Sequence, residues 1–353
     1  MSKKHNFSAG PCILPNEVFQ QSSEAIIDFN QSGLSLLEIS HRSKDFVAVM
    51  DEARAIVKRL MHLNDDYEVL FLQGGASLQF LMVPFNLLST EGTAAYTDTG
   101  KWASNAIKEA KLLGNVDVLA SSKASNYTYI PKDYTIKSNY DYFHCTSNNT
   151  IYGTQMKEFP KTEVPLVCDM SSDIFSRVVD FSQFDLIYAG AQKNMGPAGT
   201  VLVVVKKDIL GKTKRNIPSY LNYQLHIDKE SMFNTPPVFA VYTSLLTLQH
   251  LEKHGGIAAA EEKNKAKAAL LYGEIDRNPL FEGTAHTEDR SNMNVCFRLT
   301  DESKKEEFDR LWKAANINGI NGHRSVGGYR ASLYNALPIE SVQVLVEVMQ
   351  QLK

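Results

Sequence analysis

The stretch "LIYAGAQKNMGPAGTVLVVV", residues 186–205, contains two apolar runs separated by a polar interruption made mostly of small residues. Continuous apolar runs of this length are typical of strands that are buried on both faces of a sheet. Lys193 stands inside the interruption. The stretch therefore predicts two buried strands, and it raises the question of why an amine stands between them.

The sequence on both sides of this stretch alternates short apolar runs with amphipathic segments, from about residue 15 to residue 257. Such alternation is typical of βαβ units, which predict an α/β fold with a mostly parallel sheet between helices. Helices are expected near residues 76–89 and 101–114. The expected strands cover residues 67–73, 93–98, 115–121, 140–146, 164–170, 186–191 and 201–207.

Gly255 and Gly256 mark the expected start of a second, smaller α/β domain. A long helix is expected before them, after Pro236 and Pro237, because proline suits the first turn of a helix. Beyond the glycines we expect a helix, a strand at 293–299, a helix at 302–316, a strand at 327–335 and a last helix from 338. The predicted division is an N-terminal segment 1–15, a large domain 16–256 and a small C-terminal domain 257–353.

Composition excludes several classes of protein. The formal net charge is −3, from 37 Lys+Arg and 40 Asp+Glu, so we expect no binding to nucleic acid or to an anionic membrane. The four cysteines are widely spaced, which indicates no metal site and no disulfide framework and favours the reducing cytoplasm. The sequence shows neither the apolar run of a signal peptide nor one long enough to cross a membrane.

Four kinds of chemical group follow expected strands, at the edge where parallel α/β sheets bind ligands. Gly74 to Ser77 could form a phosphate cup, Trp102 could stack on a planar ligand, Asp169 offers a buried carboxylate and Lys193 an amine. Each has an ordinary structural explanation: a tight turn with a serine N-cap, a core tryptophan, a capping aspartate and a solvated lysine. Together, however, they match the needs of pyridoxal 5'-phosphate: its phosphate, ring, pyridine nitrogen and aldehyde.

Seven motifs along the chain resemble those of the phosphoserine aminotransferases, a family of fold-type I, class V pyridoxal-phosphate enzymes. The resemblance covers nearly the whole chain and implies a large domain like that of aspartate aminotransferase. The motifs are "HRS" at 41–43, "GGAS" at 74–77, "GKWAS" at 100–104, "NNTIYG" at 148–153, "YAGAQKNMGPAG" at 188–199, "NTPP" at 234–237 and "GHRSVGGYRASLYNA" at 322–336.

The resemblance implies a role for each matching residue that faces the cofactor. Lys193 would bond to the cofactor's aldehyde, Asp169 would pair with the pyridine nitrogen and Trp102 would stack on the ring. The remaining cofactor residues would be Ala76, Ser77 and Gln192 at the phosphate, Thr150 near the ring hydroxyl, and Asn234 and Thr235 reaching the same phosphate across a homodimer interface.

The substrates implied are L-glutamate and 3-phosphohydroxypyruvate, which would give 2-oxoglutarate and O-phospho-L-serine in serine biosynthesis. Both carry two anionic groups, and arginine binds carboxylates and phosphates through paired hydrogen bonds. The resemblance assigns Arg330 to the α-carboxylate. It assigns the distal phosphate to His41, Arg42, His323 and Arg324, some of them from the neighbouring subunit. Formation of 4-phosphohydroxy-L-threonine for pyridoxine synthesis stays open.

Three alternatives remain open on the sequence alone. A cysteine desulfurase would need a reactive cysteine, but Cys296 lies in a strand that is expected to be buried. An alanine or serine aminotransferase acting with glyoxylate would have no use for a distal anion site. A non-catalytic phosphate-binding α/β protein, in which Lys193 only closes a phosphate loop, would be colourless.

Overall fold

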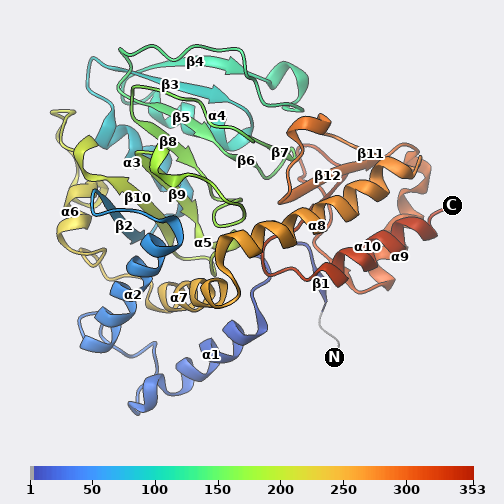
Figure 1. Ribbon diagram of the computed structural model, residues 1–353, viewed down its shortest axis with the longest axis horizontal. Helices are drawn as coiled ribbons and strands as arrows, with labels where there is room; N and C mark the ends of the chain where they lie inside the picture. Colours follow the sequence, from blue (N-terminus) through green and yellow to red (C-terminus); the bar gives the residue numbers. More distant parts are fainter. Residues whose placement is uncertain (1–3) are drawn as a thin grey trace.

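A seven-stranded sheet forms the centre of the larger part of the molecule in the computed structural model, which describes residues 4–353 (Figure 1). Its order is β2-β10-β9-β8-β5-β3-β4, and only β10 runs antiparallel to its two neighbours. This confirms the mostly parallel sheet. The strands are β2 (Tyr67–Leu72), β3 (Thr93–Asp98), β4 (Asn115–Ser121), β5 (Phe143–Thr146), β8 (Leu166–Asp169), β9 (Leu186–Gly190) and β10 (Val201–Lys206).

Helices cover both faces of this sheet (Figure 1). In β2, Val69 and Phe71 belong to the apolar core under α2 (Lys44–Met61) and α7 (Val238–Lys253). Leu70 and Leu72 point the other way, into the core under α3 (Gly75–Leu87) and α4 (Lys101–Ala110). Successive strand residues face opposite sides, so a strand that is apolar throughout must be covered twice. The short helix α6 (Tyr223–Asp228) lies beside β2.

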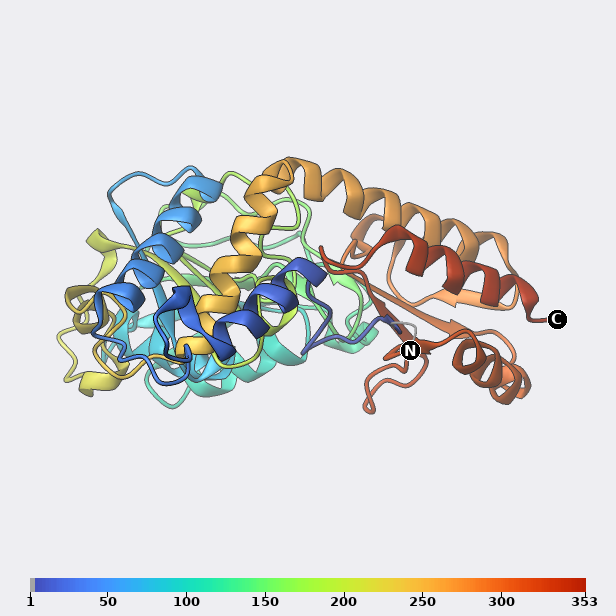
Figure 2. The same ribbon diagram turned by 90° about the horizontal axis from the view of Figure 1, so that it is seen from below.

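The C-terminal part has its own apolar core and a three-stranded antiparallel sheet in the order β11-β12-β14. Figure 2 shows α8 and α10 lying side by side above this sheet. The elements are α8 (Gly256–Arg277), β11 (Phe281–Gly283), β12 (Asn294–Leu299), α9 (Lys305–Ala314), β14 (Tyr329–Ser332) and α10 (Ile339–Gln351). They match the expected order of helices and strands, with β11 as an additional short strand.

The N-terminal segment joins the two parts. β1 (His5–Asn6) pairs in parallel with β13 (Ile317–Asn318), and Phe7 and Ile13 lie in the C-terminal core. The chain then enters α1 (Asn16–Ile27), which packs on α7. Residues 5–13 thus pack with the C-terminal part, whereas the domain boundaries at 15 and 256 stay a prediction.

No helix within residues 4–353 combines the length and apolar character needed to cross a bilayer.

Candidate active site

Lys193 lies just after the end of β9, in the single helical turn α5 (Ala191–Asn194). The loop that follows packs tightly on α7, where a Cβ added at Gly196 would collide with Ser244 Oγ and lie 3.2 Å from Ser244 Cβ. On the other side, a Cβ added at Gly10 would lie 3.4 Å from Lys193 Cγ. The segment that carries Lys193 therefore packs against α7 on one side and against the N-terminal segment on the other.

The amine of Lys193 donates a hydrogen bond to Thr150 Oγ1 at 2.9 Å and lies 5.9 Å from the centre of the Trp102 ring. Burial lowers the pKa of Lys193 to about 8; the positive charge of Arg330 also lowers it, whereas the negative charge of Asp169 opposes the shift. About a tenth of the amine is therefore uncharged at pH 7, and about half of it at pH 8. An uncharged amine is the form that attacks an aldehyde.

Asp169 ends β8, the strand next to β9, and its side chain is buried. Its Oδ1 accepts a hydrogen bond of 2.9 Å from the backbone N–H of Ser171. Burial raises the pKa of Asp169, and the charge of Lys193 and the bond from Ser171 oppose that rise. A carboxylate in this position is stabilised by any positive group that approaches it, such as a protonated ring nitrogen.

The turn between β2 and α3 contains two consecutive glycines in the left-handed conformation. Gly74 and Gly75 have φ angles of 83° and 59°, in the left-handed region that favours glycine. Ala76 and the exposed Ser77 follow in the first turn of α3, whose N-terminus has no side-chain cap. Free backbone N–H groups at a helix N-terminus attract anions.

Gln192 is the second residue of α5 and folds back toward Gly190. Its Oε1 would lie 2.7 Å from a Cβ atom added at Gly190.

Asn234 and Thr235 lie next to the turn formed by Gly74 to Ser77, within the same chain. Asn234 Nδ2 donates to Gln73 Oε1 at 3.2 Å, and Gln73 Nε2 donates to the carbonyl of Thr235 at 2.6 Å. Gln73 directly precedes Gly74. The reach of Asn234 and Thr235 across a dimer interface stays a prediction.

Arg330 connects the C-terminal part of the chain to the region around the Lys193 amine. Its Nη1, on β14, donates to the carbonyl of Thr150 at 3.3 Å, and its buried Nε has no hydrogen-bond partner among residues 4–353. Burial lowers the pKa of His323, and the charges of Arg330, Arg324 and Lys101 lower it further. These four basic residues thus gather in one region and could bind an anion.

Lys101 is a member of this group that the sequence analysis does not assign. It is the first residue of α4 and stands beside Trp102 in the motif "GKWAS". Its position in the sequence beside Trp102 is the signal from which it could have been predicted.

His41 and Arg42 are not brought to this group within the chain. They lie in the turn before α2, where the backbone N–H of Arg42 bonds to Ser40 Oγ at 3.3 Å and the Arg42 side chain is exposed. Within residues 4–353, no hydrogen bond or ion pair joins them to Lys193 or Arg330. The predicted contribution of these residues from a neighbouring subunit therefore remains to be tested.

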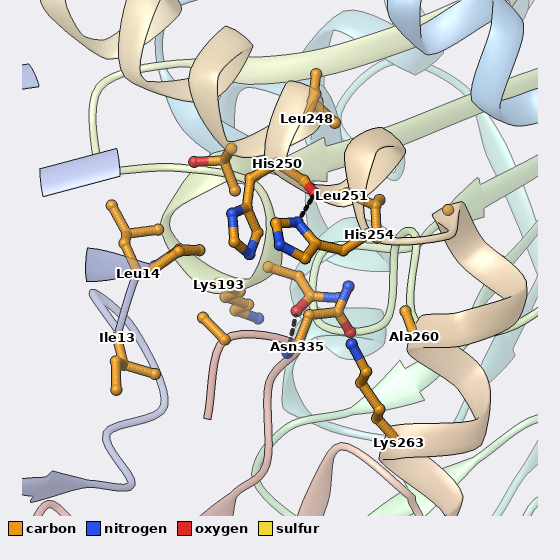
Figure 3. Close-up of a pocket in the computed structure, with 15 residues that line it drawn as sticks. Ile13, Leu14, Lys193, Leu248, His250, Leu251, His254, Ala260, Lys263 and Asn335 are labelled. Atoms are coloured by element: carbon orange, nitrogen blue, oxygen red, sulfur yellow. Dashed lines mark hydrogen bonds between the residues drawn. The ribbon is translucent and has the colours of Figure 1, made fainter. Parts of the chain in front are cut away.

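The N-terminal segment and Asn335 also touch α5, which the sequence analysis does not predict. The thiol of Cys12 contacts the carbonyl of Lys193, and Asn194 Oδ1 accepts from the backbone N–H of Asn335 at 2.8 Å (Figure 3). Burial raises the pKa of both Cys12 and Cys296 to about 12. Neither thiol ionises readily, which argues against a cysteine desulfurase.

Pyridoxal phosphate fits this donor set. The site offers an uncapped helix N-terminus for the phosphate, an aromatic ring, a buried carboxylate and an amine with a lowered pKa. Two buried polar atoms, Trp102 Nε1 and Arg330 Nε, have no partner within residues 4–353. Buried polar groups are nearly always paired, so these two atoms are available to a bound cofactor or substrate.

The fold and the site together define a pyridoxal-phosphate enzyme of the aminotransferase class. Residues 4–345 match the family described as aminotransferase class-V. The chain is 69% identical to the phosphoserine aminotransferase of Flavobacterium psychrophilum, over 99% of each chain. It belongs to the class-V aminotransferase family and, within it, to the phosphoserine aminotransferases.

Solved structures of such enzymes are also close. The phosphoserine aminotransferase of Bacillus circulans subsp. alkalophilus is 44% identical with a TM-score of 0.96, covering 99% of this chain and 98% of that one. The pyridoxal-phosphate-bound enzyme of Trichomonas vaginalis is 33% identical with a TM-score of 0.93, covering 99% of this chain and 100% of that one. These likenesses confirm the predicted family, fold and cofactor.

Proposed function

We propose that this enzyme transfers the amino group of L-glutamate to 3-phosphohydroxypyruvate, giving 2-oxoglutarate and O-phospho-L-serine in serine biosynthesis. The observation that carries the proposal is the connection from Lys193 through Thr150 to Arg330. It places a reactive amine next to a guanidinium group that can hold a substrate carboxylate. Both amino acids and both keto acids of this reaction have that carboxylate next to the reacting carbon.

Bound pyridoxal phosphate would supply an electron-accepting ring conjugated to an aldehyde. Lys193 would hold the aldehyde carbon, and Asp169 would keep the pyridine nitrogen protonated. Trp102 would fix the plane of the ring, and the N-terminus of α3 with Ser77 would bind the phosphate. Lys193 Nζ, when it is not bonded to the cofactor, would be the group placed to hold the proton that leaves the substrate's α-carbon.

Arg330 would orient the α-carboxylate, so that the bond to the α-hydrogen faces Lys193. His323 and Arg324, with Lys101 nearby, would bind the distal phosphate of 3-phosphohydroxypyruvate or the side-chain carboxylate of glutamate. Two anion sites at a fixed separation select substrates with two anionic ends. This requirement favours phosphoserine and glutamate over the short substrates of the glyoxylate aminotransferases.

We further propose a cytoplasmic homodimer. All four cysteines are free, which suits a reducing compartment. His41 and Arg42 lie away from the site of their own chain, which suits a role in a neighbour's site.

The test is the visible spectrum and the site of covalent attachment. Wild-type protein dialysed after incubation with pyridoxal phosphate should keep a visible absorption band, which borohydride removes while fixing the cofactor on residue 193 as seen by mass spectrometry. Lys193→Ala should lack both signals, and Lys137→Ala, at an exposed lysine, should keep both. A wild-type protein that retains no cofactor, or one with cofactor that produces no phosphoserine from the two substrates, would contradict the proposal.

A further inference from the structure

A second group of metal-binding side chains lies outside the residues assigned to transamination. It consists of Glu17 on α1, His250 in the last turn of α7 and His254 just after α7. One ligand atom from each of these residues lies within 4.8 Å of the other two. Glu17 and His250 are 233 positions apart, so the sequence pattern alone gives no sign of the group.

The two histidine rings lie close together, and a backbone hydrogen bond fixes the ring of His254. The rings lie 4.0 Å apart between centres, and Figure 3 shows them side by side at the end of α7. His254 Nδ1 donates to the carbonyl of His250 at 2.7 Å, which leaves Nε2 of the neutral ring with a free lone pair. A hydrogen bond from the second ring nitrogen to a backbone carbonyl is the usual way in which proteins orient a metal-binding histidine.

The spacing of Glu17 and His250 also suits an ion. His250 Nδ1 lies 3.2 Å from Glu17 Oε2. Two ligands of one tetrahedral zinc ion, each about 2.0–2.1 Å from the metal, are about 3.3 Å apart. A metal ion could therefore replace the proton between these two atoms with almost no change in their separation, and only His254 would need to move closer.

We propose that Glu17, His250 and His254 bind one divalent transition-metal ion of the Zn²⁺ type, with water completing the tetrahedron. Two imidazoles and one carboxylate form a donor set that suits zinc and similar ions better than Mg²⁺ or Ca²⁺. All three side chains reach solvent, which gives the ion a path of entry.

The ion would fasten α1 to the end of α7. His250 and His254 line a cavity of about 70 Å³ together with Lys193 and with Ile13 and Leu14, which lead into α1 (Figure 3). The metal would therefore strengthen one wall of the space behind the active-site lysine. Its expected effect is structural, because none of its ligands is assigned to the reaction.

The charge of Lys253 opposes the ion and offers a sharper test. Its Nζ donates to Glu17 Oε1 at 3.0 Å, on the carboxylate oxygen that does not face His250. Removing this competing cation should strengthen metal binding. The Glu17→Gln variant separates this site from binding to the two histidines alone, because it removes the third ligand and keeps both histidines.

The experiment is a titration of untagged, cofactor-loaded enzyme with Co²⁺, whose visible d–d bands report four-coordinate binding, followed by competition with Zn²⁺. We expect one ion per chain and a higher midpoint of thermal unfolding. Glu17→Gln, His250→Gln and His254→Gln should each weaken binding by about 10-fold or more. His286→Gln, at an exposed histidine elsewhere, should bind as the wild type does, and Lys253→Met should bind more tightly.

Several results would overturn the proposal: no Co²⁺ bands in the wild type, unchanged binding in the three ligand variants, or an equal loss in His286→Gln. Zinc that fails to displace Co²⁺ would overturn the assignment to an ion of the Zn²⁺ type. Circular dichroism of each variant separates loss of a ligand from loss of the fold.

Discussion

At the scale of single residues, the pKa of Lys193 results from influences that act in opposite directions. Burial destabilises its charged form and the guanidinium of Arg330 adds to this, whereas the buried carboxylate of Asp169 favours the charge. The balance leaves the pKa at about 8 instead of 10.5. A lysine in water at pH 7 is almost entirely protonated, so this environment raises the reactive fraction by more than a hundredfold, at about tenfold for each pKa unit.

The lowered pKa predicts how the enzyme without cofactor takes up pyridoxal phosphate. Only the neutral amine attacks the aldehyde, so the rate of covalent attachment should rise with pH and reach half of its maximum near pH 8. Stopped-flow absorbance at saturating cofactor measures this rate. In Asp169→Asn the midpoint should move to lower pH, because the charge that favours protonation is gone. A midpoint above pH 10 in the wild type would mean that Lys193 is solvated.

Arg330 should matter to both substrates, because both have an α-carboxylate. Losing one partner of a buried charged pair costs about 2–5 kcal/mol, so Arg330→Ala should lower kcat/KM by about 30-fold or more for glutamate and for the keto acid alike. Arg330→Lys should recover only part of this loss, since an ammonium group cannot bind a carboxylate through two parallel bonds. Arg298→Ala, an exposed arginine on the same small sheet, is the control.

Arg324 should act on one end of the substrate only. Arg324→Ala is expected to raise the KM for 3-phosphohydroxypyruvate far more than it weakens cofactor binding, because its charge acts on His323, which is proposed to bind the distal anion and not the cofactor phosphate. Steady-state kinetics and a cofactor titration measure the two effects separately. Equal losses in both, or none in either, would show that the distal anion site is elsewhere.

At the scale of elements, the loop after α5 depends on its contact with α7. Gly196→Ala would place a methyl group against Ser244, a form of overpacking that costs about 1–3 kcal/mol. We expect a lower midpoint of urea unfolding and a weaker visible band from bound cofactor. Ser244 Oγ has no hydrogen-bond partner in the described part of the chain, so Ser244→Ala alone should be nearly neutral. In the double variant it should restore part of the loss, and strictly additive effects would refute the contact.

Elements with clear turn signals could be predicted from the sequence closely. The strands 93–98 and 115–121 have the bounds observed, since glycine or charged turn residues stand at their ends. The antiparallel direction of β10 and the pairing of β1 with β13 could not be predicted, because they depend on contacts between distant segments. The short turn α5 was expected as an irregular loop, since four residues are too few to show a helical period.

The residues of the candidate site divide in the same way: some have a local signal in the sequence, and others depend on contacts between distant segments. Asp169 and Lys193 could be found because each comes directly after a recognisable strand. The contact between Arg330 and Thr150 could not, because it joins residues 180 positions apart across the two parts of the molecule. Cys12 could not be predicted for the same reason, because its neighbours are close only after folding, whereas Lys101 has a signal in the sequence, its place beside Trp102.

At the scale of the whole molecule, three distant segments meet at α5 and the loop directly after it. The N-terminal segment contacts α5 through Cys12 and the C-terminal part contacts it through Asn335, whereas α7 contacts the following loop, where Ser244 lies against Gly196. The position of Lys193 therefore depends on the packing of both parts of the chain. His41 and Arg42 are the assigned residues that this packing leaves out, and a second chain is the simplest way to bring them in.

A mixing experiment tests whether active sites are shared between chains. Lys193→Ala and the double variant His41→Ala/Arg42→Ala should each be nearly inactive. In a heterodimer of the two, the site with Lys193 from one chain and His41 and Arg42 from the other is intact. After unfolding and refolding of an equal mixture, half of the dimers are mixed and each has one native site, so activity should return to about a quarter of the wild-type value. Refolded single variants control for recovery without mixing. If the mixture stays as inactive as its components, while light scattering shows that dimers form, His41 and Arg42 do not act across the interface.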